Sequence, residues 1–253
     1  MFPYHDENQT LRPAFVTIAF IAINVLVWLL VQGAGSALPL ARSVCNLGLI
    51  PAELTGTLPP GTRFPLGEGL ACVIDPGRQV SHVFTSMFLH GSWMHLLGNM
   101  WFLWLFGNNV EDSMGHGRFV VFYLVCGIAA ALAQVVANPA SGIPMVGASG
   151  AISGVMGGYL VLYPHVRVYV LVFLGFFVTT ITLPAWTMLL YWFALQFLGG
   201  LTSLVAERGG GVAFWAHAGG FVAGLVLVKL FSRSAYVDAH RAGTWRPRRL
   251  RTS

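Results

Sequence analysis

Six long apolar segments constrain this 253-residue chain more than any other feature of its sequence. A helix needs about 20 apolar residues to cross the hydrocarbon core of a bilayer. Charged residues make up only 9% of the chain, against about 25% in a soluble domain. We therefore expect an all-α polytopic membrane protein with a bundle of six transmembrane helices. The predicted spans lie at about 14–32, 92–111, 118–137, 149–163, 183–204 and 213–231.

The remaining segments give the expected domain organisation. Residues 1–13 are predicted to be a cytoplasmic tail, 14–231 the membrane domain, and 232–253 a second, basic cytoplasmic tail. No cleavable signal peptide is evident, because the first residues are polar and acidic. The external first loop, 33–91, is rich in Pro and Gly, which argues against a regular core of its own. The apolar stretch 166–182 is interpreted as lying at the membrane interface, with extension of the fourth span or a reentrant piece as alternatives.

Lys and Arg predict the orientation, because they concentrate in cytoplasmic loops. With six spans, both termini share one side, and that side holds most of the basic residues. We therefore expect cytoplasmic termini and an integral, multi-pass protein of a bacterial inner (plasma) membrane. The last part of the basic tail, residues 241–253, is interpreted as a solvated, disordered segment, with contact to anionic lipids as the alternative. The side with the termini holds Arg12, Arg118, Arg167, Lys229, Arg233, Arg241, Arg246, Arg248, Arg249 and Arg251, and the other side holds Arg42, Arg63, Arg78 and Arg208.

One serine and one histidine are the polar groups inside these spans that suggest chemistry. Ser149 opens the fourth span, and the 15 residues from Ser149 to Tyr163 rise roughly 22 Å. That length is short of the hydrocarbon core of about 30 Å, so Ser149 is expected to start below the outer boundary. His217 lies near the start of the last span and therefore at a similar depth. Buried polar groups in a membrane are costly, and a serine beside a histidine is the arrangement of an activated nucleophile.

The acidic residues exclude several other mechanisms. None of the nine lies in the fourth or sixth span, so a dyad of Ser149 and His217 is expected rather than a triad. The same distribution disfavours a pair of intramembrane aspartates. The chain contains no HExxH zinc motif and no phosphate-binding GxGxxG or P-loop. We expect no metal, no cofactor and no nucleic-acid partner, and the oligomeric state stays open.

His95 and Asn99 form a second polar pair, four residues apart and therefore on one face of the second span. With Ser92 as the N-cap, this pair is also expected in the outer half of the membrane. One hypothesis is that both side chains, with the Ser149 backbone N–H, donate hydrogen bonds to an oxyanion. The alternative is a structural network that joins neighbouring helices.

Glycines surround both candidate catalytic residues. Gly147 and Gly150 flank Ser149, and Gly220 and Gly224 follow His217 with the GxxxG spacing of closely packed helices. Close packing of the fourth and sixth spans is expected to bring the imidazole to the hydroxyl. Gly219 lies on a different helical face, where a larger side chain is expected to do less harm. A packing role alone, without catalysis, is the simpler interpretation of GxSG taken in isolation.

The three cysteines are assigned by position. Cys45 and Cys72 both fall in the external loop, where a disulfide persists, although their spacing leaves the pairing open. Cys126 lies inside the third span and is interpreted as a small packing residue.

Three separated motifs now agree in order with one known family. They are the H-x-x-x-N pair of His95 and Asn99, GxSG at 147–150, and the HxxGxxxG that starts at His217. On these motifs, across about residues 80–228, the chain resembles the rhomboid family of intramembrane serine proteases.

The resemblance implies a Ser149 nucleophile, a His217 base and an oxyanion site that includes His95 and Asn99. It also implies cleavage of transmembrane or juxtamembrane segments of other membrane proteins, within membrane lipids. Two positions depart from the family pattern. Ser81-His82 stands where the family often has Trp-Arg, and Ser153 stands where several members have a Tyr that stacks on the base.

Two other functional classes compete with a protease. A catalytically dead relative would bind and escort membrane clients, but it is expected to lack Ser149 or His217, and both are present. A transporter or channel would need ionisable residues along a path across the membrane. The polar residues of this chain cluster in the outer half, and the inner half is expected to be dry.

Overall fold

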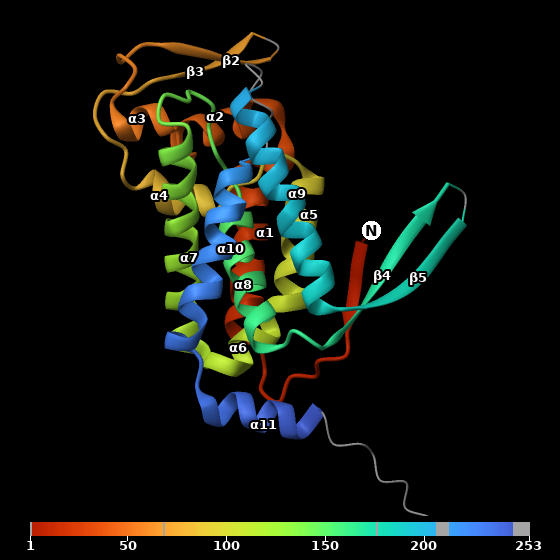
Figure 1. Cartoon of the computed structure of the whole chain (residues 1–253). Coiled ribbons are helices and arrows are strands. Elements are labelled where there is room, and N and C mark those ends of the chain that lie inside the picture. The colour runs from red at the N-terminus through yellow and green to blue at the C-terminus, as the bar shows by residue number, and fades with distance from the viewer. Residues whose placement is uncertain (1, 68, 176, 206–212, 245–253) are drawn as a thin grey trace, which may run out of the picture.

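The computed structural model describes residues 2–67, 69–175, 177–205 and 213–244. All six apolar segments are helical and stand side by side in a bundle (Figure 1). The second is interrupted by a single π-helical turn, η3, between α5 and α6. The helices are α1 (Phe15–Leu30), α5 (Trp93–Phe102), η3 (Leu103–Gly107), α6 (Asn108–Met114), α7 (His116–Ala137), α8 (Ser149–Leu162), α9 (Ala185–Val205) and α10 (Phe214–Phe231).

These helices differ in how well each suits a membrane span. Within the described residues, α7 and α10 are both long enough and apolar enough to cross a membrane by themselves. The apolar helices α1 and α8 are shorter. The 14 residues of α8 rise about 21 Å, which is shorter than the hydrocarbon core of about 30 Å.

The loop 33–91 folds into a cap over one end of the bundle (Figure 1). Cys45 and Cys72 form a disulfide, and Cys72 is fully buried with Ile50, Ala52 and Ile74. The expectation that this loop has no core of its own was wrong, because the disulfide joins a few apolar side chains into a small core. The cap contains η1 (Gly33–Gly35), α2 (Ala37–Leu47), α3 (Pro51–Thr55), β2 (Arg63–Gly67), β3 (Leu70–Val73), α4 (His82–Thr85) and η2 (Ser86–Phe88).

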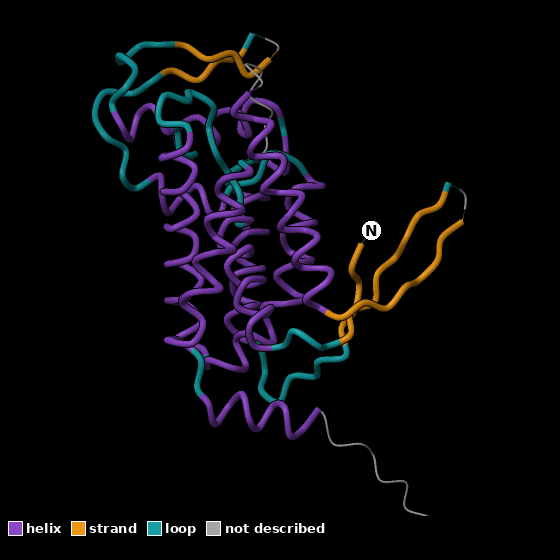
Figure 2. The backbone as a smooth tube through the Cα atoms, in the orientation of Figure 1, coloured by secondary structure: helices purple, strands orange, loops and turns teal. Residues whose placement is uncertain are grey.

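The strands correct the all-α prediction. Besides the β2–β3 pair, β1 (Phe2–Asp6), β4 (Arg167–Leu174) and β5 (Phe177–Pro184) form an antiparallel sheet beside the bundle (Figure 2). The stretch 166–182, interpreted as an interfacial segment, is therefore most of a β-hairpin. Its β-branched and aromatic residues favour strands, and Gly175 in the left-handed region permits the turn.

Both terminal segments pack against the bundle instead of forming free tails. Strand β1 pairs with β4, and the side chain of Asp6 is buried against Tyr159 of α8 and Asn109 of α6. Helix α11 (Ser234–Thr244) lies across the end of the bundle opposite the cap (Figure 1). The rest of the predicted basic tail, 245–253, lies outside the described residues.

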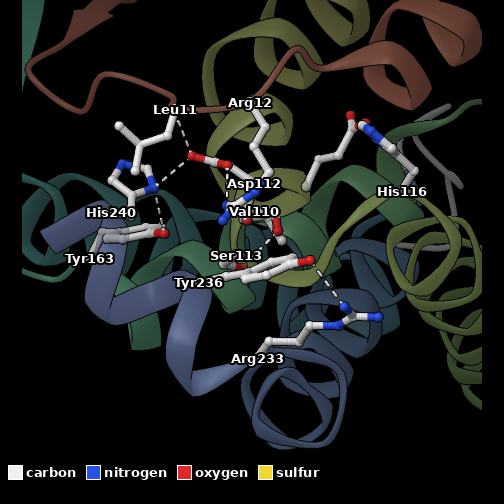
Figure 3. A network of polar contacts seen from close by, with 11 residues as sticks. Leu11, Arg12, Val110, Asp112, Ser113, His116, Tyr163, Arg233, Tyr236 and His240 are labelled. Carbon is white, nitrogen blue, oxygen red and sulfur yellow. Dashed lines mark hydrogen bonds and ion pairs between the residues drawn. The ribbon is translucent and has the colours of Figure 1, made fainter. Parts of the chain in front are cut away.

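A polar network fixes the two terminal segments to this end of the bundle (Figure 3). The carboxylate of Asp112 is fully buried and accepts hydrogen bonds from the Leu11 N–H at 2.8 Å and from Arg12 at 2.8 Å. The His240 imidazole of α11 lies 3.1 Å from the same carboxylate and 3.1 Å from the Tyr163 hydroxyl. The end of the bundle opposite the cap is therefore polar inside, because the N-terminal segment and α11 add partners for Asp112 that no predicted span contains.

A second carboxylate anchors the start of α1 at the same end. The Glu111 side chain accepts hydrogen bonds from the Val16 N–H at 2.9 Å, the Thr17 N–H at 2.8 Å and the Thr17 hydroxyl at 2.7 Å. A carboxylate at a helix N-terminus satisfies N–H groups that have no partner inside the helix. Nδ1 of the His116 imidazole lies 2.6 Å from Oε1 of Glu111, the oxygen that also accepts from Val16.

Glycines allow α10 to contact α8 through backbone atoms. A Cβ placed at Gly220 would overlap the Gly150 carbonyl oxygen, and one at Gly224 would overlap the Gly154 carbonyl oxygen. The expectation that Gly219 is less restricted was wrong, because a Cβ there would overlap the Ala133 methyl of α7. Helix α10 is thus packed closely on two sides.

Candidate active site

Ser149 and His217 meet at the cap end of the α8–α10 contact. Ser149 is the first residue of α8, and its Oγ lies 2.8 Å from Nε2 of His217 on α10. The other ring nitrogen of His217, Nδ1, lies 2.7 Å from Oε1 of Gln196 on α9. Both catalytic candidates are half-buried. A hydroxyl at this distance from an imidazole nitrogen has the geometry of a serine activated by a general base.

The segment before α8 holds the serine in place. Gly147 has a φ of +132°, a region that strongly favours glycine, and its N–H donates to the Ser86 carbonyl oxygen at 2.9 Å. A Cβ at Gly147 would lie 2.8 Å from Nε2 of His95 and 3.4 Å from Oγ of Ser149. The missing side chain therefore leaves room for the His95 imidazole to approach the nucleophile.

The His95 and Asn99 side chains supply donors toward the same space. Nδ1 of His95 accepts a hydrogen bond from the Gly91 N–H at 3.3 Å, so in the neutral imidazole the proton is on Nε2. The Asn99 side chain is buried, and its Nδ2 has no hydrogen-bond partner among the described residues. The Ser149 N–H belongs to the first turn of α8, where backbone donors have no partner inside the helix.

These groups line one cavity of about 680 Å³. Ser149, His217, His95, Asn99 and Gln196 all contribute to its wall, together with apolar side chains from α5 and α8. The cavity is large enough to accept an extended segment of polypeptide. All four residues predicted from the sequence are thus brought together around a single space.

Two residues in this site were missed by sequence reasoning. Gln196 contacts His217 directly, and the Trp192 ring lies 5.9 Å from the imidazole, centroid to centroid, one turn earlier on α9. Ser153, at the position of the family's stacking Tyr, instead donates to the Ser149 carbonyl oxygen at 2.6 Å within α8. Gln196 was detectable, because it is the sole amide side chain in the apolar segment 183–204 and such groups are rare in membrane helices.

The neighbouring histidines do not join this site through hydrogen bonds. Nδ1 of His82 lies 3.8 Å from the Glu53 carboxylate, and both ring nitrogens of His90 are buried without a hydrogen-bond partner among the described residues. The backbone N–H of His90 donates to Gln32 at 2.8 Å. Burial raises the pKa of Glu53, although the Asp75 N–H donates a hydrogen bond to it. The described residues contain no group of three or more His, Cys, Asp or Glu side chains able to hold a metal ion.

Comparison with known proteins identifies the family to which this bundle and its serine–histidine pair belong. Residues 77–234 match the rhomboid domain, which includes every site residue described above. The chain belongs to the rhomboid family and is an integral membrane protein.

The similar proteins come from several compartments. The chain is 30% identical over 168 residues to "Rhomboid protein 1, mitochondrial" of Saccharomyces cerevisiae, which covers 63% of this chain and 45% of that protein. It is 42% identical over 76 residues to "Rhomboid protease GluP" of Bacillus subtilis, which covers 30% of this chain and 14% of that protein. It is 39% identical over 70 residues to "Rhomboid-like protein 11, chloroplastic" of Arabidopsis thaliana, and this match covers 28% of this chain and 25% of that protein. The chain thus spans less than half the length of each of these relatives.

Proposed function

We propose that this protein is an intramembrane serine endopeptidase that hydrolyses peptide bonds in or near transmembrane segments of other proteins. The observation that carries the proposal is the 2.8 Å contact between Oγ of Ser149 and Nε2 of His217. The rhomboid domain match and the similarity to a named rhomboid protease support it.

The geometry supports the following sequence of steps. Nε2 of His217 takes the hydroxyl proton as Oγ of Ser149 attacks the scissile carbonyl carbon. The resulting oxyanion accepts hydrogen bonds from the Ser149 N–H, the His95 Nε2–H and the Asn99 amide. His217 then passes its proton to the leaving amine, and an acyl-enzyme remains on Ser149. Water activated by His217 hydrolyses that ester and restores the dyad.

The proposed membrane arrangement has six spans, both termini on the cytoplasmic side and the loop 33–91 outside. The basic residues on the side of the termini support this orientation. The Cys45–Cys72 disulfide supports an external cap, because disulfides persist in oxidising compartments. The short helix α8 would put the dyad below the outer boundary, within reach of a substrate in the bilayer. The relatives named for mitochondria and chloroplasts give no support to a bacterial inner membrane in particular.

A non-catalytic, client-binding role is the competing proposal. Its loss of chemistry would be expected to appear as a missing or displaced nucleophile or base. Here the two groups are present and within hydrogen-bond distance of each other, which favours catalysis.

Reaction with a fluorophosphonate probe tests the proposal. The wild-type protein should be labelled at Ser149 and should cleave a quenched fluorogenic peptide that contains one transmembrane segment. Ser149→Ala should lose labelling and should lower cleavage by roughly 10⁴-fold or more. Ser113→Ala, on α6 and outside the cavity wall, is the matched control and should keep both. Equal labelling of wild type and Ser149→Ala would contradict the proposal.

A further inference from the structure

Gln196 makes the hydrogen bond that decides which nitrogen of His217 faces the serine. Its Oε1 lies 2.7 Å from Nδ1 of the imidazole, while Nε2 lies 2.8 Å from Oγ of Ser149. A carbonyl oxygen only accepts hydrogen bonds, so Nδ1 must carry the ring proton. The neutral imidazole then presents the lone pair of Nε2 to the Ser149 hydroxyl. This is the tautomer that a general base requires.

No acid performs this role in the described part of the chain. Acids are absent from α8, α9 and α10 within their described residues. Besides Ser149, the titratable group close to His217 is the imidazole of His95 on α5. Gln196 therefore occupies the position that the third member of a triad would occupy, but with a neutral acceptor.

Helix α9 supplies a second contact to the same ring. Trp192 and Gln196 are four residues apart and so share one helical face. The Trp192 ring lies 5.9 Å from the imidazole and 6.1 Å from the Phe221 ring one turn further along α10. Phe193 of α9 also stacks on Phe221 at 4.8 Å. These aromatic contacts fix the distance of α9 from α10, and with it the position of the amide.

We propose that Gln196 is a positioning residue, which holds His217 in the Nδ1–H tautomer and thereby makes catalysis depend on α9 being seated against α10. The inference rests on the proposed function, since it assigns the group that orients its base. Displacement of α9 by even 1 Å would break the hydrogen bond and leave an enzyme whose nucleophile is present but unactivated. Misplacement on that scale can cost roughly 10²-fold in rate.

Two substitutions of similar size separate positioning from packing. Gln196→Met keeps the length of the side chain and removes the acceptor, so kcat should fall on the order of 10-fold to 100-fold with little change in KM. Gln196→Glu keeps an acceptor and should retain most of the activity. Its carboxylate stabilises the imidazolium, so the acidic limb of the pH–rate profile should move to higher pH. Leu195→Ala, at a half-exposed neighbouring position of α9, is the matched control and should leave kcat unchanged.

An activity-independent measurement keeps this inference distinct from the proposed function. In ¹⁵N spectra of histidine-labelled protein, His217 should appear as the Nδ1–H tautomer in the wild type and should lose that preference in Gln196→Met. The His217→Ala protein assigns the signal. A wild-type protein that neither reacts with the probe nor cleaves peptide would contradict the proposed protease activity. The tautomer of His217 would still be measurable in that protein, so the role of Gln196 would be tested separately. A Gln196→Met protein with wild-type kcat, or with an unchanged tautomer, would overturn the role of Gln196.

Discussion

Asp112 and Asn99 lie at opposite ends of the bundle, and their buried side chains differ in whether they have hydrogen-bond partners. At the end opposite the cap, Asp112 accepts hydrogen bonds from Leu11 and Arg12 and lies 3.1 Å from His240, so its carboxylate is fully paired (Figure 3). At the cap end, Nδ2 of Asn99 is buried without a partner among the described residues and faces a cavity of about 680 Å³. An unpaired buried donor costs free energy, whereas a paired one is nearly neutral or stabilising.

The difference indicates which polar cluster serves stability and which serves chemistry. The paired network joins the N-terminal segment, α6 and α11. The unpaired Asn99 donor lines the same cavity as Ser149, and in the proposed mechanism it gains a partner when an oxyanion forms. Substitutions at the two ends should therefore change different measured quantities, and the following experiments test that separation.

The largest expected effect is on turnover at the cap end. Asn99→Ala should lower kcat on the order of 10²-fold, because one oxyanion donor is lost. Its thermal stability in detergent should stay close to wild type, because the removed amide has no protein partner at Nδ2. Asn109→Ala is the matched control at the other end, since its Nδ2 donates to Asp6 at 3.1 Å, and it should lower stability without changing kcat per folded molecule. Loss of stability in Asn99→Ala with normal turnover would assign Asn99 to structure.

The buried carboxyl group of Asp6 should make the stability of the end opposite the cap depend on pH. Burial raises the pKa of Asp6 to about 6, although Tyr159 donates a hydrogen bond to it. A raised pKa in the folded state contributes stability that is full below the unfolded value near 3.9 and is lost as the pH rises through about 6. Unfolding measured at pH 4 and pH 7 should show a loss of about 2 kcal/mol from this group. Asp6→Asn should abolish that part of the pH dependence, and an unaltered profile would contradict the assignment.

Substitution of Asp112 should give the smallest change in the free energy of unfolding. Its dependence on pH should be opposite to that of Asp6. Burial alone would raise the pKa of Asp112, but hydrogen bonds from His240, the Leu11 N–H and Arg12 hold it below its ordinary value. The stability it contributes is therefore present above pH 4 and is lost as the pH falls through the folded pKa. Asp112→Asn should lower the unfolding free energy by about 1.5 kcal/mol at pH 7. The two proteins should converge in acid, and turnover per folded molecule should not change.

The sequence predicts those parts of this molecule that depend on local pattern. The helix ends agree with the predicted spans to within a few residues, because apolar runs and flanking Pro and Gly are local signals. Ser149, His217, His95 and Asn99 are brought to one cavity, as their common depth and the glycine spacing predicted. The catalytic roles of these residues stay predictions until the substitutions are made.

The parts that depend on pairing between distant segments were not predictable in this way. The β1–β4 pairing joins Phe2 to Leu171, and no periodicity in residues 1–13 reveals a partner so far along the chain. Docking of α11 depends on the contact between His240 and Asp112, which single-sequence patterns do not show. Gln196 is a different case. The sequence shows that it is a rare amide in an apolar segment, but it does not show that the amide contacts His217.

The contact between α8 and α10 has a consequence for how far this sequence can diverge. The carbonyl oxygens of Gly150 and Gly154 lie where Cβ atoms at Gly220 and Gly224 would be, so the approach of the helices is limited by main-chain atoms. Main-chain atoms are the same in every sequence. The exposed side chains of α10, Val222, Val226 and Leu230, can therefore be exchanged without altering the spacing between Ser149 and His217, provided that these glycines are kept. The surface of α10 that faces away from the bundle is then free to adapt to a membrane of different composition.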